Sequence, residues 1–435
     1  MKRLPGIHAP HLKNTDAKTA EILPVPKLVH IPMSMHIGAP ARSVVTVGDI
    51  VKVGQLLGEP DGAVSSPVHS SVSGTVKSID AIDAVTNERG TVIIIESDGL
   101  QTPLETLTPP DVNTAEDFIA AVRDSGVVGL GGAGFPTAVK LTVKDIAQVE
   151  YFIVNGAECE PYITSDTRTM IDDAELLWDG IRLVKKHLGV TNILIGIENN
   201  KPEAIRVLSD YAAKEPIAKV VSLPAMYPQG GEKVLIYNLT GRIVEEGKLP
   251  LDAGCIVINC TTLAAVARYI KTGMPLVEKR VTVDGSAVRT PKNVIAPIGT
   301  PLSDIFDFCG GLTDDVRKIL YGGPMMGVAV LSVSAPVKKS TNAIIALNAK
   351  DAALPRETEC IRCGRCIGGC PLGLMPAVLR DYFLLGRTDM LEKYKVNLCM
   401  ECGCCSFNCP AKRSLTQTMK LAKARLRESQ AAKNK

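Results

Sequence analysis

Two stretches near the end of the 435-residue chain repeat one pattern of cysteines: residues 360–371 read CIRCGRCIGGCP, and residues 399–410 read CMECGCCSFNCP. In each stretch, three cysteines are spaced two residues apart, and a fourth follows after three more residues, directly before a proline. This spacing is the signature of bacterial ferredoxins with two [4Fe–4S] clusters. Three neighbouring thiolates reach three corners of one cubane, and the fourth corner takes the last cysteine of the other stretch.

We therefore predict two clusters whose ligands cross between the stretches. Disulfides are disfavoured because the start of the chain lacks the apolar core of a secretory signal, so we expect a reducing compartment. Zinc is disfavoured because zinc sites use two ligand pairs separated by a longer loop. The predicted ligands are Cys360, Cys363, Cys366 and Cys409 for one cluster, and Cys399, Cys402, Cys405 and Cys370 for the other.

The remaining five of the 13 cysteines are not expected to bind metal. One of them, Cys404, lies inside the second stretch. The other four suit positions for small side chains in a core: Cys159, Cys255, Cys260 and Cys309.

Composition excludes several classes of protein. Hydrophobic residues make up 46% of the chain and charged residues 22%, which is ordinary for a folded soluble protein. Aromatic residues make up only 4%, which argues against a surface that stacks nucleic-acid bases. The most apolar stretch, residues 253–267, is shorter than the roughly 18 residues of a membrane helix, so we expect no transmembrane segment. Residues 411–435 form a basic tail, which either binds an anionic partner or is simply solvated.

The second informative stretch is GLGGAGFPT at residues 129–137. Its glycines fit G-x-G-x-x-G, which marks a dinucleotide site only when a strand precedes it. Residues 114–124 instead have the pattern of an amphipathic helix, so that interpretation is disfavoured. What remains is a run of backbone N–H groups, followed by a proline where a helix can begin. This geometry suits a phosphate, and the alternative is a flexible glycine turn.

The middle of the chain alternates between strand and helix patterns. Such alternation predicts a parallel sheet with a ligand crevice at the carboxyl ends of its strands. Residues 155–161 (NGAECEP) and Asn259 directly follow two of the expected strands, so we expect them at that crevice. The expected strands are 150–154, 192–197, 219–223 and 255–258, and the expected helices are 173–188 and 202–214.

Four segments, residues 129–137, 155–161, 227–232 and 259–263, resemble the flavin site of the NADH-binding flavoprotein subunit of respiratory complex I. Over nearly the whole chain, the sequence resembles the RnfC family, which forms the C subunit of the Rnf electron-transport complex. The two cysteine stretches and residues 322–327 (GGPMMG) share this second resemblance. It implies noncovalent FMN, NADH at the flavin face, and onward transfer of electrons through the clusters.

The resemblance also implies roles for individual residues. Glu158 and Glu232 are the implied catalytic residues, and Phe135 would stack on the nicotinamide or adenine ring. Two positions depart from the complex I pattern, because Ala157 and Gly231 stand where that subunit has acidic residues. The implied cofactor-binding residues are Gly129, Gly131, Gly132, Gly134, Phe135, Lys140, Asn155, Glu158, Gly230, Glu232, Asn259 and Thr262.

Two further modules flank the flavin-like region. Residues 47–55 and 66–76 resemble a biotinyl- or lipoyl-type barrel. Residues 57–72 contain no lysine to carry a swinging arm, so we expect a scaffold in which His69 is structural. Residues 281–311 resemble a small β-grasp module.

We therefore expect a multidomain α/β protein. Its parallel-sheet FMN domain would follow a biotinyl/lipoyl-like barrel and precede a β-grasp module and a ferredoxin-like helical domain with two [4Fe–4S] clusters. An apolar stripe in the basic tail suits packing on the ferredoxin-like domain or on a partner: Leu415, Met419, Ala422 and Leu426. The expected divisions are 1–110 (barrel), 111–275 (FMN and NADH), 276–345 (β-grasp), 346–414 (clusters) and 415–435 (tail).

The resemblance implies a peripheral subunit of an ion-translocating NAD:ferredoxin oxidoreductase on the cytoplasmic face of the bacterial inner membrane. NADH releases two electrons together whereas each cluster takes one, so a flavin is needed between them. The implied partners are a cluster-rich B subunit, membrane subunits D, E, A and G, NADH and, indirectly, ferredoxin. Two alternatives are a flavin and iron–sulfur cobalamin reductase, in which the glycine loop comes first and the barrel late, and a non-catalytic electron-relay subunit.

Overall fold

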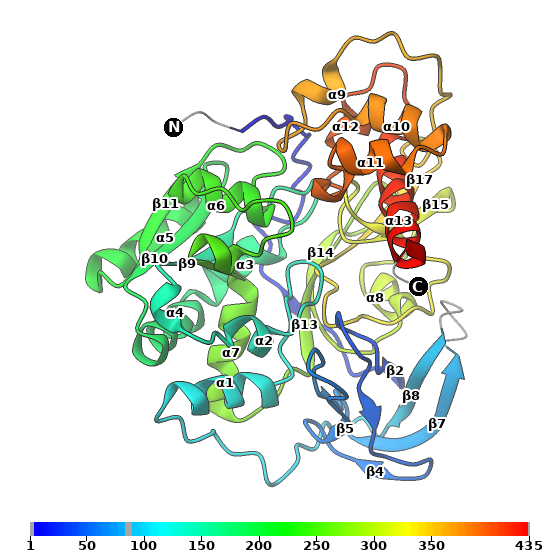
Figure 1. The fold of residues 1–435 in the computed structure, drawn as a ribbon. Helices are drawn as coiled ribbons and strands as arrows, with labels where there is room; N and C mark the ends of the chain where they lie inside the picture. The colour runs from blue at the N-terminus through cyan, green and yellow to red at the C-terminus, as the bar shows by residue number, and fades with distance from the viewer. Residues whose placement is uncertain (1–3, 83–88, 434–435) are drawn as a thin grey trace.

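The computed structural model describes residues 4–82 and 89–433. Figure 1 shows four regions: two small sheets at the lower right, a parallel sheet with helices at the left, a mixed sheet in the centre and a helical region at the top. In the described part of the chain, no helix is long and apolar enough to cross a membrane.

The first region consists of two small antiparallel sheets, with strand orders β2-β8-β7-β4 and β3-β5-β6. Alternate residues of β2, Val29 and Ile31, are fully buried, as expected where one face of a strand meets a core. Leu57 of β5 and Val68 of β6 belong to the same core. The strands are β2 (Leu28–Pro32), β3 (Arg42–Ser43), β4 (Ile50–Val51), β5 (Leu56–Glu59), β6 (Val68–His69), β7 (Gly74–Ile82) and β8 (Arg89–Ser97).

The second region contains a four-stranded parallel sheet in the order β11-β10-β9-β12, which confirms the predicted parallel alternation. Its strands are nearly continuous apolar runs because helices cover both faces. Phe152 and Val154 belong to the core on one face, whereas Ile153 belongs to the core on the other. The strands are β9 (Tyr151–Gly156), β10 (Asn192–Glu198), β11 (Lys219–Leu223) and β12 (Cys255–Asn259).

Some helices of this region begin or end at residues with clear capping roles. The predicted helix at 114–124 is present as α1, where Thr114 and Asp117 form a capping box. The helix α4 ends at Gly189, which has a φ of 68°. The helices are α1 (Ala115–Asp124), α2 (Thr137–Leu141), α3 (Ser165–Asp172), α4 (Ala174–Leu188), α5 (Pro202–Lys214), α6 (Glu232–Thr240) and α7 (Cys260–Thr272), with short 3₁₀ turns at Ile146–Gln148 and Pro250–Ala253.

The third region is a mixed sheet in the order β1-β14-β13-β17-β15-β16. One helix, α8 (Leu302–Phe308), packs on this sheet through the buried side chains of Leu302, Ile305 and Phe306. Residues 281–311, where we expected a small β-grasp module, contain α8 and part of this sheet. The strands are β1 (Glu21–Ile22), β13 (Glu278–Asp284), β14 (Lys292–Pro297), β15 (Val316–Tyr321), β16 (Val328–Ala329) and β17 (Ala343–Asn348).

The fourth region contains both cysteine stretches and five helices. The long C-terminal helix packs its apolar stripe inside this region, because Met419, Ala422 and Leu426 share a core with Leu379 and Leu391. The stripe therefore packs within the chain and not on a partner. The helices are α9 (Arg365–Gly368), α10 (Pro376–Leu384), α11 (Thr388–Lys393), α12 (Cys404–Phe407) and α13 (Leu415–Lys433), with a 3₁₀ turn at Val396–Leu398.

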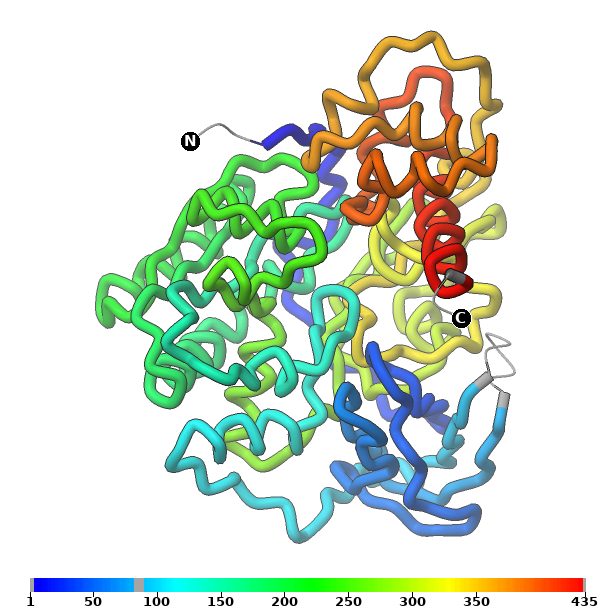
Figure 2. The backbone as a smooth tube through the Cα atoms, in the orientation of Figure 1, coloured from blue at the N-terminus to red at the C-terminus, as the bar shows by residue number. Residues whose placement is uncertain are grey.

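An N-terminal arm connects the regions. Figure 2 shows its dark blue trace passing between the parallel-sheet region and the rest of the molecule. Near the start of the arm, Ile7 exchanges two backbone hydrogen bonds with Tyr227, at 2.8 and 2.9 Å. Further along, β1 joins the edge of the mixed sheet in parallel with β14. No local pattern in the sequence indicates this arm.

Candidate functional site

The carboxyl edge of the parallel sheet brings several predicted site residues together. Asn155 near the end of β9 and Asn259 at the end of β12 are paired in register. The Asn155 side chain donates from Nδ2 to Gly230 O (2.9 Å), and its Oδ1 accepts from Ala157 N (3.1 Å). Asn155 therefore ties the turn after β9 to the loop before α6.

Asn259 connects the start of α7 to a second group of residues. Its Oδ1 accepts from Thr262 N (3.1 Å), which caps α7, and its Nδ2 donates to Asp166 Oδ2 (2.7 Å). Thr262 Oγ1 in turn accepts from Leu130 N (2.9 Å), within the glycine loop. The predicted residues Asn259 and Thr262 thus hold the glycine loop against the sheet edge, whereas Asp166 had no signal in the sequence.

The glycine loop closes on itself as a narrow turn. Val128 pairs with Pro136, and Gly129 N donates to Phe135 O (2.9 Å). A Cβ atom at Gly131 would lie 2.3 Å from Asn259 Nδ2, whereas one at Gly132 would have no protein atom within 4 Å. The loop therefore requires glycine at 131 for its own packing, and its backbone at 132 is left open to a ligand.

The other two predicted residues of the loop are placed as follows. Gly134 has a φ of +70°, a conformation that favours glycine, and Phe135 is partly buried beside it. The predicted start of a helix at Pro136 is confirmed, since α2 begins at Thr137.

Lys140 and Glu232 meet at the same edge. Lys140 Nζ lies 2.6 Å from Glu232 Oε1 and donates to Val257 O at 2.9 Å. Each side chain keeps about a third of its surface exposed, at 32% and 37%. A Cβ atom at the neighbouring Gly230 would lie 2.3 Å from Ala157 O, so this loop must approach the turn after β9 closely.

Glu158 is placed differently from the other predicted residues. It is 6% exposed, and its carboxylate accepts from the backbone N–H groups of Asp166 (2.8 Å) and Thr167 (3.2 Å) at the start of α3. The carboxylate therefore caps a helix N-terminus. Burial raises the pKa of Glu158, whereas the nearby Lys13 lowers it. Its catalytic role stays a prediction.

Two lysines that sequence reasoning missed, the partly buried Lys13 and the buried Lys201, fix the segment after β9. Lys13 on the N-terminal arm donates to the main-chain oxygens of Glu158 (3.0 Å) and Glu160 (2.8 Å). Lys201 donates to Glu158 O (3.1 Å) and forms a buried ion pair with Glu198 (2.8 Å). Both lysines approach from distant parts of the chain, so the sequence carries no local signal of their role.

The cysteine stretches lie side by side, with thiols from one stretch near thiols of the other. Burial raises the pKa of Cys370, and the nearby Cys402 of the second stretch raises it further. Burial likewise raises the pKa of Cys366, and Cys409 adds to that effect. One cavity is lined by all four predicted ligands of the second cluster: Cys370, Cys399, Cys402 and Cys405.

Among the described residues, no group of three or more His, Cys, Asp or Glu side chains could hold a single metal ion. A cubane cluster requires a different arrangement of ligands, because each of its four thiolates binds a separate iron at its own corner. The crossed neighbourhood of thiols and the shared cavity fit that arrangement for the second cluster. The iron–sulfur assignment itself stays a proposal.

The second cysteine stretch packs directly on the loop that carries Gly230 and Glu232. A Cβ atom at Gly231 would lie 2.2 Å from Met400 Cε, and the Cys404 thiol donates to Tyr227 O at 3.9 Å. Cys402 and Cys404 share a small apolar core with Tyr227 and Ile7. The second stretch is thus in contact with the candidate nucleotide edge.

Three regions of the sequence match models of known domains. Residues 122–268 match the Nuo51 FMN-binding domain, residues 2–100 match the RnfC barrel sandwich hybrid domain, and residues 280–329 match the SLBB domain. These matches correspond to the parallel-sheet region, the two small sheets and the mixed sheet.

The chain is 41% identical over 431 residues to the C subunit of the Na⁺-translocating ferredoxin:NAD⁺ oxidoreductase complex of Acetobacterium woodii, covering 96% of this chain and 95% of that protein. The chain belongs to the RnfC family. Another member, the C subunit of the proton-translocating ferredoxin:NAD⁺ oxidoreductase complex of Clostridium ljungdahlii, is 40% identical over 90% of this chain and 85% of its own length. The C subunit of the ion-translocating oxidoreductase complex of Rhodobacter capsulatus is 37% identical over 99% and 84%.

Membership of the RnfC family and its matched domains confirm the predicted multidomain α/β architecture: a barrel-sandwich domain, an FMN-binding domain and an SLBB domain, in that order. The chain is thus similar to redox subunits of ion-translocating complexes. Among solved structures, an NAD⁺-reducing [NiFe]-hydrogenase in its air-oxidised state is 18% identical with a TM-score of 0.47, covering 72% of this chain and 53% of that one.

Proposed function

We propose that this chain is the peripheral subunit of a membrane-bound, ion-translocating NAD:ferredoxin oxidoreductase that exchanges electrons with NADH. The support comes from relatives named as the C subunit of such complexes, which match this chain over nearly its full length. Bound FMN would exchange hydride with NADH and release single electrons to two [4Fe–4S] clusters. The expected partners are the B subunit, the membrane subunits D, E, A and G, and indirectly ferredoxin, on the cytoplasmic face of the membrane.

The observation that carries the proposal is the convergence of three segments at one sheet edge. The backbone at Gly132 is open, Asn259 and Thr262 hold the glycine loop in place, and Lys140 supplies a partly exposed ammonium beside them. An ammonium and unobstructed N–H groups are the chemistry that a phosphate requires. We propose that these residues hold the phosphate side of FMN, with Asn155 and Gly230 at its ribityl and ring side.

Glu232 and Phe135 are the residues proposed to act on the nicotinamide side. Glu232 is partly exposed, so its carboxylate is accessible to a nucleotide ribose or ring. The buried Glu158 is better suited to positioning, because its oxygens are occupied by the start of α3. We therefore propose that Glu158 orders the segment after β9. The sequence alone did not distinguish this positioning role from a catalytic role.

The contact between the second cysteine stretch and the Gly230–Glu232 loop supports electron exchange within one chain. Met400 lies against Gly231, and Cys402 shares a core with Tyr227. The residues proposed to bind the second cluster therefore adjoin those proposed to bind flavin. In the first stretch, by contrast, Cys363 is exposed at the surface of this chain.

Two alternatives make different predictions. A cobalamin reductase would carry its glycine loop before its barrel, but here the barrel match at 2–100 precedes the FMN-domain match at 122–268. A pure electron relay would need no flavin, yet it would leave the open backbone at Gly132 and the Lys140–Glu232 pair without a purpose.

The deciding experiment is anaerobic purification of the full chain, followed by acid extraction of cofactors, iron analysis and titration with NADH. We expect about one FMN and about eight irons per chain, with the flavin absorbance bleached by NADH. We also expect the isolated chain to oxidise NADH when an artificial electron acceptor is supplied. About eight irons without FMN, or FMN that NADH leaves oxidised, would contradict the proposal and favour a relay.

A further inference from the structure

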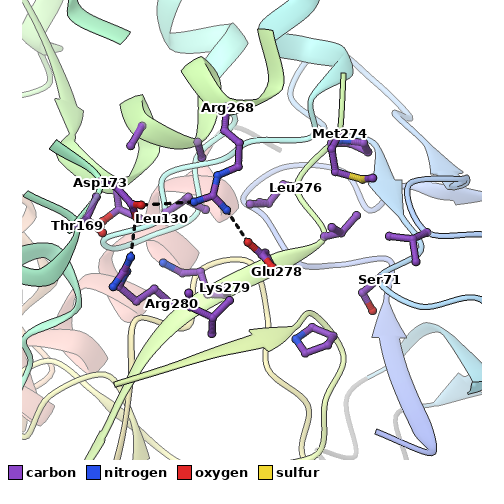
Figure 3. Close-up of a pocket in the computed structure, with 18 of the residues that line it drawn as sticks. Ser71, Leu130, Thr169, Asp173, Arg268, Met274, Leu276, Glu278, Lys279 and Arg280 are labelled. Carbon is purple, nitrogen blue, oxygen red and sulfur yellow. Dashed lines mark hydrogen bonds and ion pairs between the residues drawn. The ribbon is translucent and has the colours of Figure 1, made fainter. Parts of the chain in front are cut away.

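A cavity of about 300 Å³ lies where the barrel, the FMN-binding domain and β13 of the mixed sheet meet (Figure 3). Its wall includes Ser71 from the barrel, Leu130 and Arg268 from the FMN-binding domain, and Glu278 from β13. None of the residues predicted to bind FMN or iron lines it. The volume is at the lower end of the range for small-molecule sites, about 300 to 1,000 Å³.

Most of the charges around this cavity neutralise one another. Arg280 is 2.7 Å from Asp173, and Arg268 pairs with both Asp173 (3.8 Å) and Glu278 (2.5 Å), as the dashed lines of Figure 3 show. Arg280 also pairs with Asp172, at 3.0 Å. The carboxylates of the cavity wall are therefore already occupied by arginines.

Lys279 is the exception. It is 2% exposed, it lines the cavity, and its ammonium makes no hydrogen bond or ion pair with any other described residue. The carboxylates of Asp166 and Glu158 act on this ammonium through their charge but do not hydrogen-bond to it, because their oxygens accept from Asn259, Thr261 and the start of α3. Burial lowers the pKa of Lys279 to about 8, so the group is largely protonated at neutral pH.

A buried ammonium without a partner is costly, and it gains a charge-assisted hydrogen bond when an anion arrives. The rest of the wall is largely apolar, with Leu130, Ala264, Leu276 and Ile295 among its residues. A single free ammonium balances one negative charge, whereas a phosphate dianion would require further unpaired donors, which the paired arginines do not supply. The matching ligand is therefore a monoanion with an apolar body.

We propose that this cavity is a binding site for a small carboxylate with an apolar tail, whose carboxylate pairs with Lys279. The site is separate from the proposed FMN edge, and it does not depend on the proposed function. It adjoins that edge through Leu130, which lines the cavity and whose N–H donates to Thr262, and through Thr261, which lines the cavity and donates to Asp166.

The test uses hexanoate as the probe and hexan-1-ol as its uncharged counterpart, with binding to the anaerobically purified full chain followed by ligand-observed NMR. We expect hexanoate to bind with a Kd below about 1 mM, and Lys279→Met to weaken it about tenfold or more. Lys279→Arg keeps the charge and should retain most of the affinity. The matched control is Lys186→Met, at an exposed lysine on α4, which should bind hexanoate as the wild type does.

A folded Lys279→Met variant that binds hexanoate as tightly as the wild type would overturn the proposal. So would equal binding of hexanoate and hexan-1-ol, or no binding of hexanoate at about 10 mM. If Lys279→Met does not fold, Ala265→Leu tests the proposal instead, because the larger side chain fills the cavity from α7 and leaves the Lys279 ammonium unchanged. Ala265→Leu is expected to abolish hexanoate binding, and unchanged binding would place the ligand elsewhere. NADH oxidation is not part of the readout, so either result leaves the proposed function untouched.

Discussion

Lys140 and Glu232 form an ion pair of 2.6 Å that joins α2, directly after the glycine loop, to the first residue of α6. The same ammonium donates to Val257 O in β12, at 2.9 Å. One side chain therefore links the three segments of the FMN-binding domain on which the proposed site depends. The pair is partly exposed, so a phosphate can compete for the ammonium without first opening a buried contact.

The first prediction concerns this lysine. Lys140→Met removes the charge that is proposed to face the FMN phosphate, and we expect the affinity for FMN to fall about tenfold or more. Reconstitution of flavin-free protein, followed by quenching of FMN fluorescence, measures the affinity directly. The control is Lys144→Met, four residues further on at an exposed position. If Lys140→Met and Lys144→Met bind FMN equally well, the phosphate lies elsewhere.

The second prediction compares two neighbouring glycines. In Gly131→Ala, the new methyl group would meet Asn259 within 2.3 Å, so the loop must shift, and we expect lower stability as well as loss of FMN. In Gly132→Ala, the methyl group meets no protein atom, so we expect normal stability and loss of FMN alone. Thermal unfolding and extracted FMN separate these outcomes. A Gly132→Ala variant with full FMN would show that the cofactor does not approach this backbone.

Much of the FMN-binding domain could be predicted because its signals are local. The pattern of apolar residues predicted α5 at 202–214 and β11 at 219–223, and both agree with the structure at each end. The alternation of strand and helix patterns also predicted that the strands are parallel and that their carboxyl ends meet at one edge. Asn155 and Asn259 were therefore expected near one another, and the register of β9 and β12 pairs them.

What the sequence did not show are contacts between distant segments. Lys13 reaches the carbonyl groups after β9 from an arm that has no periodic pattern, and Lys279 is buried in a strand that reads as half polar. Glu158 matched a family motif as a flavin residue, but whether its carboxylate caps a helix depends on where α3 begins. The packing of the C-terminal stripe was open for the same reason, since amphipathicity does not identify the surface that covers it.

The third prediction concerns pH and His69 in the barrel. Burial and, to a smaller extent, the charge of the nearby Lys339 lower the pKa of His69 to about 3. Below pH 6.5, the unfolded chain binds a proton that the folded barrel does not bind, so stability is lost as the pH falls from about 6.5 towards 3. The slope is about 1.4 kcal/mol per pH unit for one group, which gives about 2 kcal/mol between pH 7 and pH 5.

Hydrogen exchange of the barrel strands measures this effect, because it reports the opening of one region in a multidomain chain. In His69→Leu, the difference in opening free energy between pH 7 and pH 5 should shrink by about 2 kcal/mol relative to the wild type. His8→Leu, at an exposed histidine of the arm, is the control and should retain the wild-type pH dependence. Equal pH dependence in the wild type and His69→Leu would mean that another group is responsible.

The last prediction tests whether the cluster ligands cross between the two cysteine stretches. The neighbouring thiols Cys370 and Cys402 come from opposite stretches, so Cys370 is expected to bind the cluster of the second stretch. The double variant Cys370→Ser/Cys399→Ser then damages one cluster and keeps about four of about eight irons. The double variant Cys370→Ser/Cys363→Ser damages both clusters and loses nearly all iron.

Ligands taken from within each stretch would give the reverse result, with the iron retained by Cys370→Ser/Cys363→Ser and lost by Cys370→Ser/Cys399→Ser. Iron analysis and low-temperature EPR of the reduced protein distinguish the two patterns, because a single remaining cluster lacks the spin coupling to a second one. Cys404→Ser is the matched control, since its thiol lies within the second stretch and donates to Tyr227 O. It should keep about eight irons, and a loss of iron in this variant would make Cys404 a ligand.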